Sequence, residues 1–169
     1  RDVLRSSSVL QNQRTDMTAS SIPPSGSSHS NTAKTGLMQG KKGLVMGVAN
    51  DRSIGWGIAA AAAGQGAELA FTYQGDALKK RVNPLAESVG SDIVLPCDVT
   101  DEGSVDLVFN TLKEKWGKLD FLVHAIAYSD KEELKGGYID TTRKNFQKTM
   151  EISVYSFTAL ARRAAEMMP

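Results

Sequence analysis

From Gly40 onward, the chain alternates short and almost wholly apolar runs with longer stretches whose apolar residues recur every three or four positions. Short apolar runs are typical of strands that are covered on both faces of a parallel sheet, and the longer stretches are typical of the helices that connect such strands. The pattern predicts strands at residues 43–48, 68–73, 92–95 and 119–125. We therefore expect an α/β fold with a doubly wound parallel sheet.

Helices are expected in the intervals, at residues 53–65, 76–89, 101–116 and 141–168. Pro84 is expected to kink the second helix, and Thr100 is expected to cap the third. The last helix carries apolar residues at spacings of three and four, so one stripe of it should face the sheet or a partner subunit. That stripe consists of Phe146, Met150, Val154, Phe157, Leu160 and Ala164.

Composition and charge exclude several classes of partner. The formal net charge of +1 gives no electrostatic reason to expect nucleic acid or an anionic membrane. No apolar run approaches the ~20 residues that a membrane span needs, and the N-terminal part lacks the apolar stretch of a secretory signal. The single cysteine, Cys97, cannot form an internal disulfide, and with His29 and His124 it provides no metal-ligand spacing. These observations predict a cytoplasmic protein that binds no metal, nucleic acid or membrane.

The segment after the first expected strand has the chemistry of a phosphate-binding loop. Gly47 allows a sharp turn, and the helix that follows begins with free amides and a positive dipole end, which favour a pyrophosphate. Ser53 adds a hydroxyl donor at this corner. Strand, glycine turn and helix in this order are typical of the Rossmann-type dinucleotide-binding fold. The spacing is not Gly-x-Gly-x-x-Gly, so a tightly packed helix without a ligand is the alternative interpretation.

The N-terminal residues differ in composition from the rest. Residues 5–36 are dominated by Ser, Thr, Asn, Gln, Gly and Pro, which bury too little apolar surface to offset the entropy of the chain. We therefore divide the sequence into a disordered tail, residues 1–39, and a partial dinucleotide-binding domain, residues 40–169. The chain begins at Arg1 and stops at Pro169 without a polar tail, so we interpret it as a fragment at both ends, with Met17 as a candidate natural start.

Gln74 follows the second expected strand, where many dinucleotide enzymes carry an acidic residue for the adenosine ribose. An amide hydrogen-bonds a ribose without repelling a 2′-phosphate, so Gln74 does not decide between NAD and NADP by charge. The basic run Lys79, Lys80 and Arg81 would favour NADP, but such a run on a helix more often forms a solvated face.

Several segments, in order along the chain, together resemble the bacterial NADH-dependent enoyl-acyl carrier protein reductases, a divergent branch of the short-chain dehydrogenase/reductase superfamily. They are Gly47-Val48-Ala49, Ser53-Ile54, residues 66–74, Cys97-Asp98-Val99 and His124-Ala125-Ile126-Ala127, and the likeness extends from about residue 40 to residue 169. The resemblance implies the strand order 3-2-1-4 in the sheet. Ordinary short-chain dehydrogenases carry Asn-Ala-Gly after the fourth strand. The sequence Ala125-Ile126-Ala127 favours the enoyl-reductase branch instead, although Ala127 stands where a glycine is common in relatives.

The resemblance implies NADH as the cofactor, with NADP less favoured, and it implies roles for residues around the pyrophosphate and the adenosine. Gly47, Ser53 and Ile54 would surround the pyrophosphate and the adjoining ribose. Gln74 would lie near the adenosine end, and Asp98 and Val99 would bracket the adenine. Capping of the following helix is the alternative role for Asp98.

The resemblance also implies which residues face the reacting end of the cofactor. Ala125, Ile126 and Ala127 would bind beside the nicotinamide ribose, and Ser129 would border the acyl substrate. His124 has no carboxylate or serine partner at a recognisable spacing, so we interpret it as structural.

The activity that the resemblance implies is the reduction of trans-2-enoyl-acyl carrier protein thioesters by NADH in fatty-acid elongation, carried out by a homotetramer. In the family, a Tyr-x6-Lys pair after a fifth strand supports this chemistry, so we expect no catalytic residue within the chain and an inactive fragment. Tyr73 with Lys80 and Tyr128 with Lys135 share that spacing, but neither pair is expected on one helical face. Another short-chain dehydrogenase that acts on an oxo or hydroxy substrate, and a non-catalytic nucleotide-binding module, remain alternatives.

Overall fold

The computed structural model describes residues 36–169. Most of the tail predicted for residues 1–39, namely residues 1–35, lies outside the described residues. The last residues of that predicted tail form a turn against the domain. The Met38 N–H donates to the Gln65 carbonyl at 3.1 Å, and the Lys41 N–H donates to the Met38 carbonyl at 3.0 Å. The chain therefore contacts the domain a few residues before the predicted boundary at Gly40.

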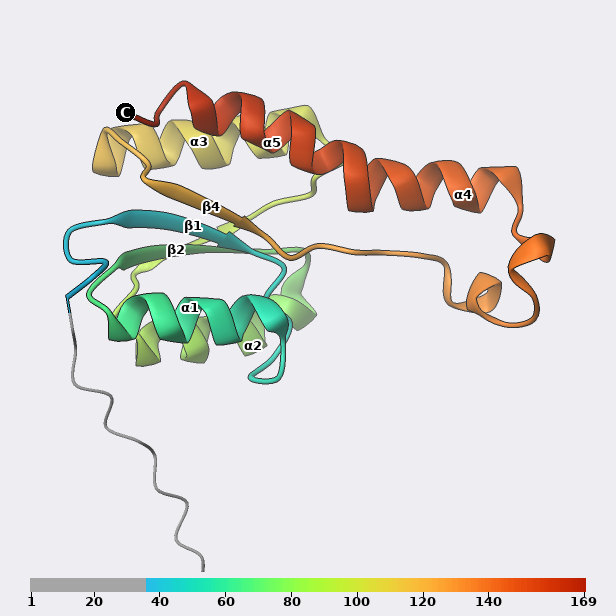
Figure 1. Ribbon diagram of the computed structural model, residues 1–169, viewed down its shortest axis with the longest axis horizontal. Coiled ribbons are helices and arrows are strands. Elements are labelled where there is room, and N and C mark those ends of the chain that lie inside the picture. Colours follow the sequence, from blue (N-terminus) through green and yellow to red (C-terminus); the bar gives the residue numbers. More distant parts are fainter. Residues whose placement is uncertain (1–35) are drawn as a thin grey trace, which may run out of the picture. The chain divides into compact units, whose positions relative to one another are not determined.

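A parallel sheet forms the centre of the domain (Figure 1). Its strands are β1 (Lys42–Met46), β2 (Glu68–Tyr73), β3 (Ile93–Pro96) and β4 (Phe121–His124), in the order β3-β2-β1-β4. The predicted α/β fold and strand order are confirmed. β1 ends two residues before the predicted limit, because Gly47 has a φ of 91° and turns the chain out of the extended conformation. β4 is shorter than predicted at both ends.

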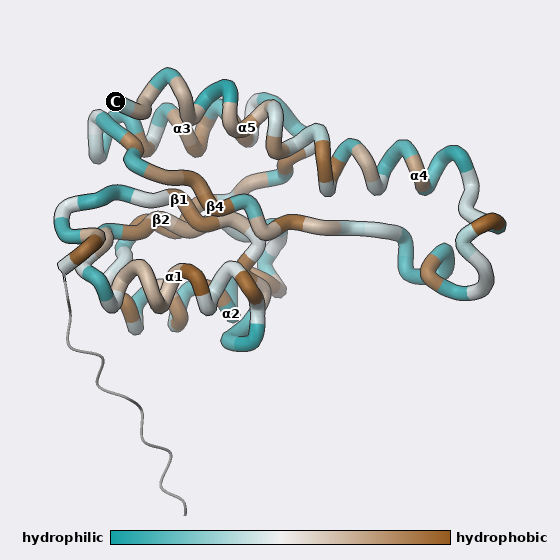
Figure 2. Tube along the Cα trace, in the orientation of Figure 1, coloured by the Kyte–Doolittle hydropathy of each residue, from teal (hydrophilic) through white to brown (hydrophobic). Residues whose placement is uncertain are grey.

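Helices cover both faces of this sheet (Figure 1). The helices α1 (Ile54–Gly64) and α2 (Asp76–Ser88) lie on one face, and α3 (Glu102–Trp116) and α5 (Ser156–Ala165) lie on the other. Successive residues of β1 point to opposite faces, so Leu44 and Met46 join the cluster around α3 and α5 while Val45 joins the cluster around Phe71. Each face carries a buried apolar cluster, and Figure 2 shows the hydrophobic colouring along β2 and β4. The sheet is therefore doubly wound, as the apolar runs predicted.

Two local predictions about the helices meet different outcomes. The helix α2 continues through Pro84, and the kink expected there stays a prediction. The prediction that Thr100 caps α3 is wrong, because Asp101 is the N-cap and its carboxylate accepts from the Gly103 N–H at 3.0 Å. Thr100 instead donates its hydroxyl to Asp98.

The long helix predicted for residues 141–168 is divided. It consists of α4 (Arg143–Met150), a π-helical turn η3 (Glu151–Tyr155) and α5. A π turn is wider than an α turn and shifts the positions that follow it around the axis. The predicted apolar stripe therefore does not stay on one face. Leu160 and Ala164 are buried, but Phe146, Met150, Val154 and Phe157 are 40–51% exposed, and we call these four residues the outer apolar face.

Asp120 joins the beginnings of β1 and β4. Its carboxylate accepts from the Lys42 N–H at 2.8 Å and lies 3.3 Å from the Lys41 ammonium and 3.2 Å from the Lys118 ammonium. The Lys42 N–H is the main cause that lowers the pKa of Asp120 to about 2. The folded chain therefore favours the ionised carboxylate.

The lowered pKa of Asp120 predicts how the stability of the folded chain depends on acid pH. An unfolded aspartate has a pKa of about 3.9, so the stabilisation by Asp120 is complete above that pH and is lost as the pH falls through about 2. Urea unfolding of the wild type and of Asp120→Asn at a series of pH values measures this. We expect the stability difference between them to shrink as the pH falls through that window, and a constant difference would contradict the assignment.

Candidate functional site

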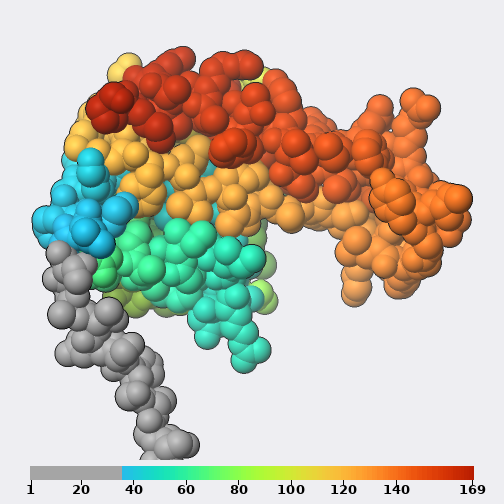
Figure 3. All heavy atoms as spheres, in the orientation of Figure 1, coloured from blue at the N-terminus to red at the C-terminus, as the bar shows by residue number. Residues whose placement is uncertain are grey.

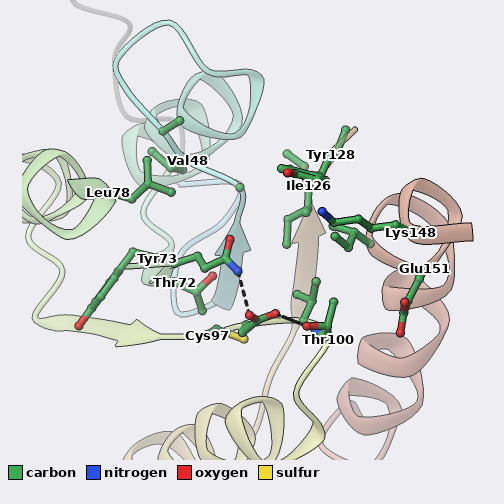
Figure 4. Close-up of a pocket in the computed structure, with 18 residues that line it drawn as sticks. Val48, Thr72, Tyr73, Leu78, Cys97, Thr100, Ile126, Tyr128, Lys148 and Glu151 are labelled. Atoms are coloured by element: carbon green, nitrogen blue, oxygen red, sulfur yellow. Dashed lines mark hydrogen bonds between the residues drawn. The ribbon is translucent and has the colours of Figure 1, made fainter. Parts of the chain in front are cut away.

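A cavity of about 710 Å³ opens at the carboxyl edge of the sheet (Figure 4). Its walls come from the chain that follows each of the four strands and from one side of α4 and η3. This volume is in the range of small-molecule and cofactor sites, and the place is where open parallel sheets bind ligands. The cavity lies between the ends of β1 and β4, where the strand order changes direction.

Gly47 forms the corner between β1 and the cavity. Its φ of 91° lies in the region that favours glycine, and a Cβ on it would lie 2.1 Å from the Ala125 carbonyl oxygen. The Ala125 N–H donates to the Met46 carbonyl at 3.0 Å, which holds the two strand ends together. The turn expected at Gly47 is therefore present, and the close approach of β4 leaves room only for glycine.

Ser53 organises the loop between β1 and α1. Its hydroxyl oxygen accepts from the Ala49 N–H and from the Asn50 N–H, each at 2.9 Å. Ser53 thus acts as an acceptor inside the loop, whereas the sequence predicted a donor to a ligand. Val48 and Ala49 line the cavity, but Ser53 does not, and Ile54 is 79% exposed.

The start of α1 carries no side-chain cap. The first N–H groups of a helix have no partner within the helix, and without a capping side chain they remain able to bind an anion. The loop that Ser53 closes leads directly into this helix. The predicted phosphate-binding role stays a prediction, because the cavity wall includes Val48 and Ala49 of this loop but neither Ser53 nor the first residues of α1.

Gln74 and Asp98 meet at the other end of the cavity. The Gln74 side-chain amide donates to one Asp98 oxygen at 2.9 Å, and the other Asp98 oxygen accepts from the Thr100 hydroxyl at 2.7 Å and the Thr100 N–H at 2.9 Å (dashed lines in Figure 4). The Thr100 hydroxyl is the largest cause that lowers the pKa of Asp98. Asp98 is therefore ionised in the folded chain, and the alternative role as the α3 cap is excluded because Asp101 fills it.

Cys97 and Val99 complete this end of the wall. Cys97 is 7% exposed, and burial raises the pKa of its thiol to about 11. The thiol is therefore protonated at neutral pH and serves as an apolar surface.

The residues after β4 form the wall opposite Gln74. Ala125, Ile126 and Ala127 line the cavity, as does Tyr128. Ser129, predicted to border a substrate, does not line it, because its hydroxyl oxygen accepts from the Asn145 amide at 3.0 Å. The structure therefore brings the Ala-Ile-Ala segment to the cavity and directs Ser129 toward α4.

Residues 128–142 extend beyond the sheet, and we call them the arm (Figure 3). The base of the arm is held to α4 by Asp130, which accepts from the Lys148 ammonium at 2.7 Å and from the Tyr128 hydroxyl at 2.9 Å. The Lys148 ammonium also lies 4.8 Å from the centre of the Tyr128 ring. These contacts fix the rim of the cavity on the side of α4.

Sequence reasoning missed the contribution of the long helix to the cavity. Lys148, Glu151 and Ile152 line it, because α4 and η3 pass over the end of β4. These three residues reach the cavity only because distant parts of the chain pack together, and no local sequence pattern indicates their position. Leu78 of α2, also in the wall, was missed for the same reason.

His124 has a partner that its sequence spacing did not reveal. Its Nε2 lies 2.7 Å from the Ser156 hydroxyl oxygen, and that hydroxyl donates its proton to the Ile152 carbonyl at 2.6 Å. The imidazole nitrogen must therefore donate to Ser156. Ser156 is 1% exposed and burial lowers the pKa of His124, so the pair ties β4 to η3 and offers no accessible nucleophile.

Both tyrosine–lysine pairs with the family's spacing fail on geometry, as predicted. Tyr73 ends β2 while Lys80 lies in α2, and Tyr128 lies in the arm while Lys135 follows a short 3-10 helix. Neither pair shares a helical face. In the described residues there is also no group of three metal-binding side chains, and no helix among them is long and apolar enough to cross a membrane.

Comparison with known proteins decides the family. A family model described as enoyl-(acyl carrier protein) reductase matches residues 47–169. The chain belongs to the enoyl-(acyl carrier protein) reductase family. The sequence resemblance to this family is thereby confirmed.

Individual members of the enoyl-(acyl carrier protein) reductase family are similar over most of the chain. The enoyl-acyl-carrier-protein reductase (NADH) 2 of Rhizobium meliloti (strain 1021) is 68% identical over 133 residues, which are 79% of this chain and 50% of that protein. Among solved structures, FabI from Candidatus Liberibacter asiaticus is 55% identical with a TM-score of 0.76, over 78% of this chain and 51% of that chain.

A reductase from Anaplasma phagocytophilum, solved in complex with NAD, is 57% identical with a TM-score of 0.74, over 78% of this chain and 50% of that chain. The chain thus spans about half the length of the enoyl-(acyl carrier protein) reductases that it matches.

Proposed function

We propose that this chain is the NADH-binding part of an enoyl-acyl carrier protein reductase. The observation that carries the proposal is the cavity at the carboxyl edge of the sheet, bounded by the Gly47 corner and the ionised Asp98. The loop that lines one end at Val48 and Ala49 leads into the uncapped start of α1, whose amides favour a pyrophosphate, and the other end offers carboxylate and amide acceptors for an adenosine. The similarity to reductases named for NADH, and to one solved with NAD, supports the same cofactor.

The phosphate-binding roles follow from the loop after β1. Gly47 allows the backbone to approach the pyrophosphate, and Ser53 holds the loop in the shape that presents it. Ile54 contributes through its N–H at the start of α1 rather than through its exposed side chain. This assignment keeps all three residues in the cofactor site but gives Ser53 an indirect role.

At the adenosine end, Asp98 accepts from the exocyclic amine of the adenine, Val99 packs against the ring, and Gln74 binds near the ribose. At the opposite end, the small side chains of Ala125 and Ala127 leave space for the nicotinamide ribose, with Ile126 between them. NADH, when bound, supplies the hydride. The residues of this chain orient and enclose it. Ser129 holds the arm near the acyl substrate through Asn145.

For the whole protein we propose reduction of trans-2-enoyl thioesters carried by acyl carrier protein, in the cytoplasm. The chain covers about half of its relatives, and the tyrosine and lysine that the family uses are expected in the remaining part. We also propose the homotetramer that the family resemblance implies, and the outer apolar face, which is 40–51% exposed on α4, η3 and α5, supports a subunit contact. An apolar face of this kind is typical of a subunit contact.

Direct binding of NADH tests the proposed function. The wild-type chain should raise NADH fluorescence and gain thermal stability with NADH, and Asp98→Ala should weaken binding about tenfold, because a carboxylate acceptor for the adenine is lost. Asp92→Ala removes the same group from an exposed position beside β3 and should leave the affinity unchanged. If NADH at millimolar concentration changes neither fluorescence nor melting temperature of the wild type, the proposal fails.

A further inference from the structure

The Asp98 carboxylate is fixed from one side. One of its oxygens accepts both the Thr100 hydroxyl at 2.7 Å and the Thr100 N–H at 2.9 Å, which fills the two lone-pair positions of that oxygen. The second oxygen accepts only from Gln74, at 2.9 Å. Because Asp98 lines the cavity, one acceptor position of the second oxygen remains for a ligand.

The hydrogen bond between Gln74 and Asp98 also determines the orientation of the Gln74 side-chain amide. An ionised carboxylate has only acceptors, so the Gln74 amide must present its nitrogen to Asp98. Its carbonyl oxygen then becomes a second acceptor near the Asp98 oxygen. The Lys79 ammonium, from the basic run on α2, lies 5.8 Å from the centre of the Tyr73 ring. This end of the cavity therefore presents two acceptors and the negative charge of Asp98, with the Lys79 ammonium over the neighbouring Tyr73 ring.

We propose that Thr100 is a positioning residue that turns Asp98 and Gln74 into a joint acceptor edge, selective for an adenosine with a free 2′-hydroxyl. The adenine amine and ribose hydroxyls donate to this edge, whereas a 2′-phosphate is repelled by the carboxylate. This inference rests on the proposed function, since it specifies which dinucleotide the cavity takes. Gln74 by its residue type alone did not decide between NADH and NADPH, and its contact with Asp98 does.

Thr100 also lines the cavity, but it has no task in the helix cap or in the core. Asp101 caps α3, and Thr100 itself is exposed. Removal of its hydroxyl therefore leaves the helix cap and the core intact, while the Asp98 carboxylate gains rotational freedom. The effect of such a change should appear in cofactor selectivity rather than in stability.

The test compares Thr100→Ala with Thr100→Ser in the full chain, using titrations with NADH, NADPH and reduced nicotinamide mononucleotide, which lacks the adenosine. Thr100→Ala should weaken NADH binding about fivefold and reduce the preference for NADH over NADPH by a similar factor. Thr100→Ser keeps the hydroxyl and should restore both values. Binding of the mononucleotide should be the same in all variants.

Thr111→Ala serves as the matched control, because its hydroxyl donates to the Leu107 carbonyl within α3, away from the cavity. It should leave the affinities unchanged. An unaltered NADH preference in Thr100→Ala, or an equal change in Thr111→Ala, would overturn the positioning role while the proposed function stands. Failure of the wild type to bind NADH would instead overturn the proposed function and this inference with it.

Discussion

Replacement of Gly47 by alanine should destabilise the chain by about 3 kcal/mol or more and abolish NADH binding. Two causes add here. The φ of 91° is unfavourable for any residue with a Cβ, and that Cβ would lie 2.1 Å from the Ala125 carbonyl oxygen. The ends of β1 and β4 would have to separate, which opens the corner of the cavity. The midpoint of urea unfolding and the NADH affinity measure the two effects.

Gly57→Ala is the matched control. Gly57 lies inside α1, and a Cβ on it would meet nothing within 4 Å. Alanine there should stabilise the chain by about 1 kcal/mol, because glycine is a poor helix former. If Gly47→Ala proves as harmless as Gly57→Ala, the close approach of β1 and β4 is wrong.

Replacement of Phe71 by alanine should cost about 3–5 kcal/mol of unfolding free energy. Phe71 is fully buried in β2, and its ring centre lies 6.4 Å from that of Trp56. The core cluster between the sheet and the helices α1 and α2 would lose its largest member and retain a cavity. Denaturant unfolding measures the loss.

Phe146→Ala makes the same change on the outer apolar face, where the side chain is 47% exposed. It should change the unfolding free energy by less than about 1 kcal/mol, and it should weaken self-association in analytical ultracentrifugation. An equal loss of stability in the two variants would contradict the assignment of Phe71 to the core and of Phe146 to the surface.

Features that depend on neighbouring residues were predictable from the sequence. The apolar runs predicted the strands, and Gly47 marked the turn at the end of β1. Both rest on short-range physics, since strand burial and a left-handed backbone leave a local signature. The segment from Ala125 to Ala127 also reached the cavity as expected.

Features that depend on the meeting of distant segments were not predictable. The π turn interrupts the regular helical period, and Phe146 and Val154 are half-exposed, so of the two contacts expected for the stripe, the sheet or a partner subunit, the sheet is excluded for these residues. Ser129 turns to Asn145, which lies in another element, and His124 finds Ser156 beyond any familiar spacing. Hydrogen bonds of this kind exist only after the chain has folded.

The π turn connects two surfaces of the molecule within a single 5-residue segment. Ile152 faces the cavity, whereas Val154 is 50% exposed on the opposite side, and the Ile152 carbonyl is held through Ser156 to the end of β4. A protein surface packed on Val154 and a ligand packed on Ile152 would press on the same backbone. Substitutions at Val154 and at Ile152 therefore act on one short backbone segment, which also carries the hydrogen bond to Ser156.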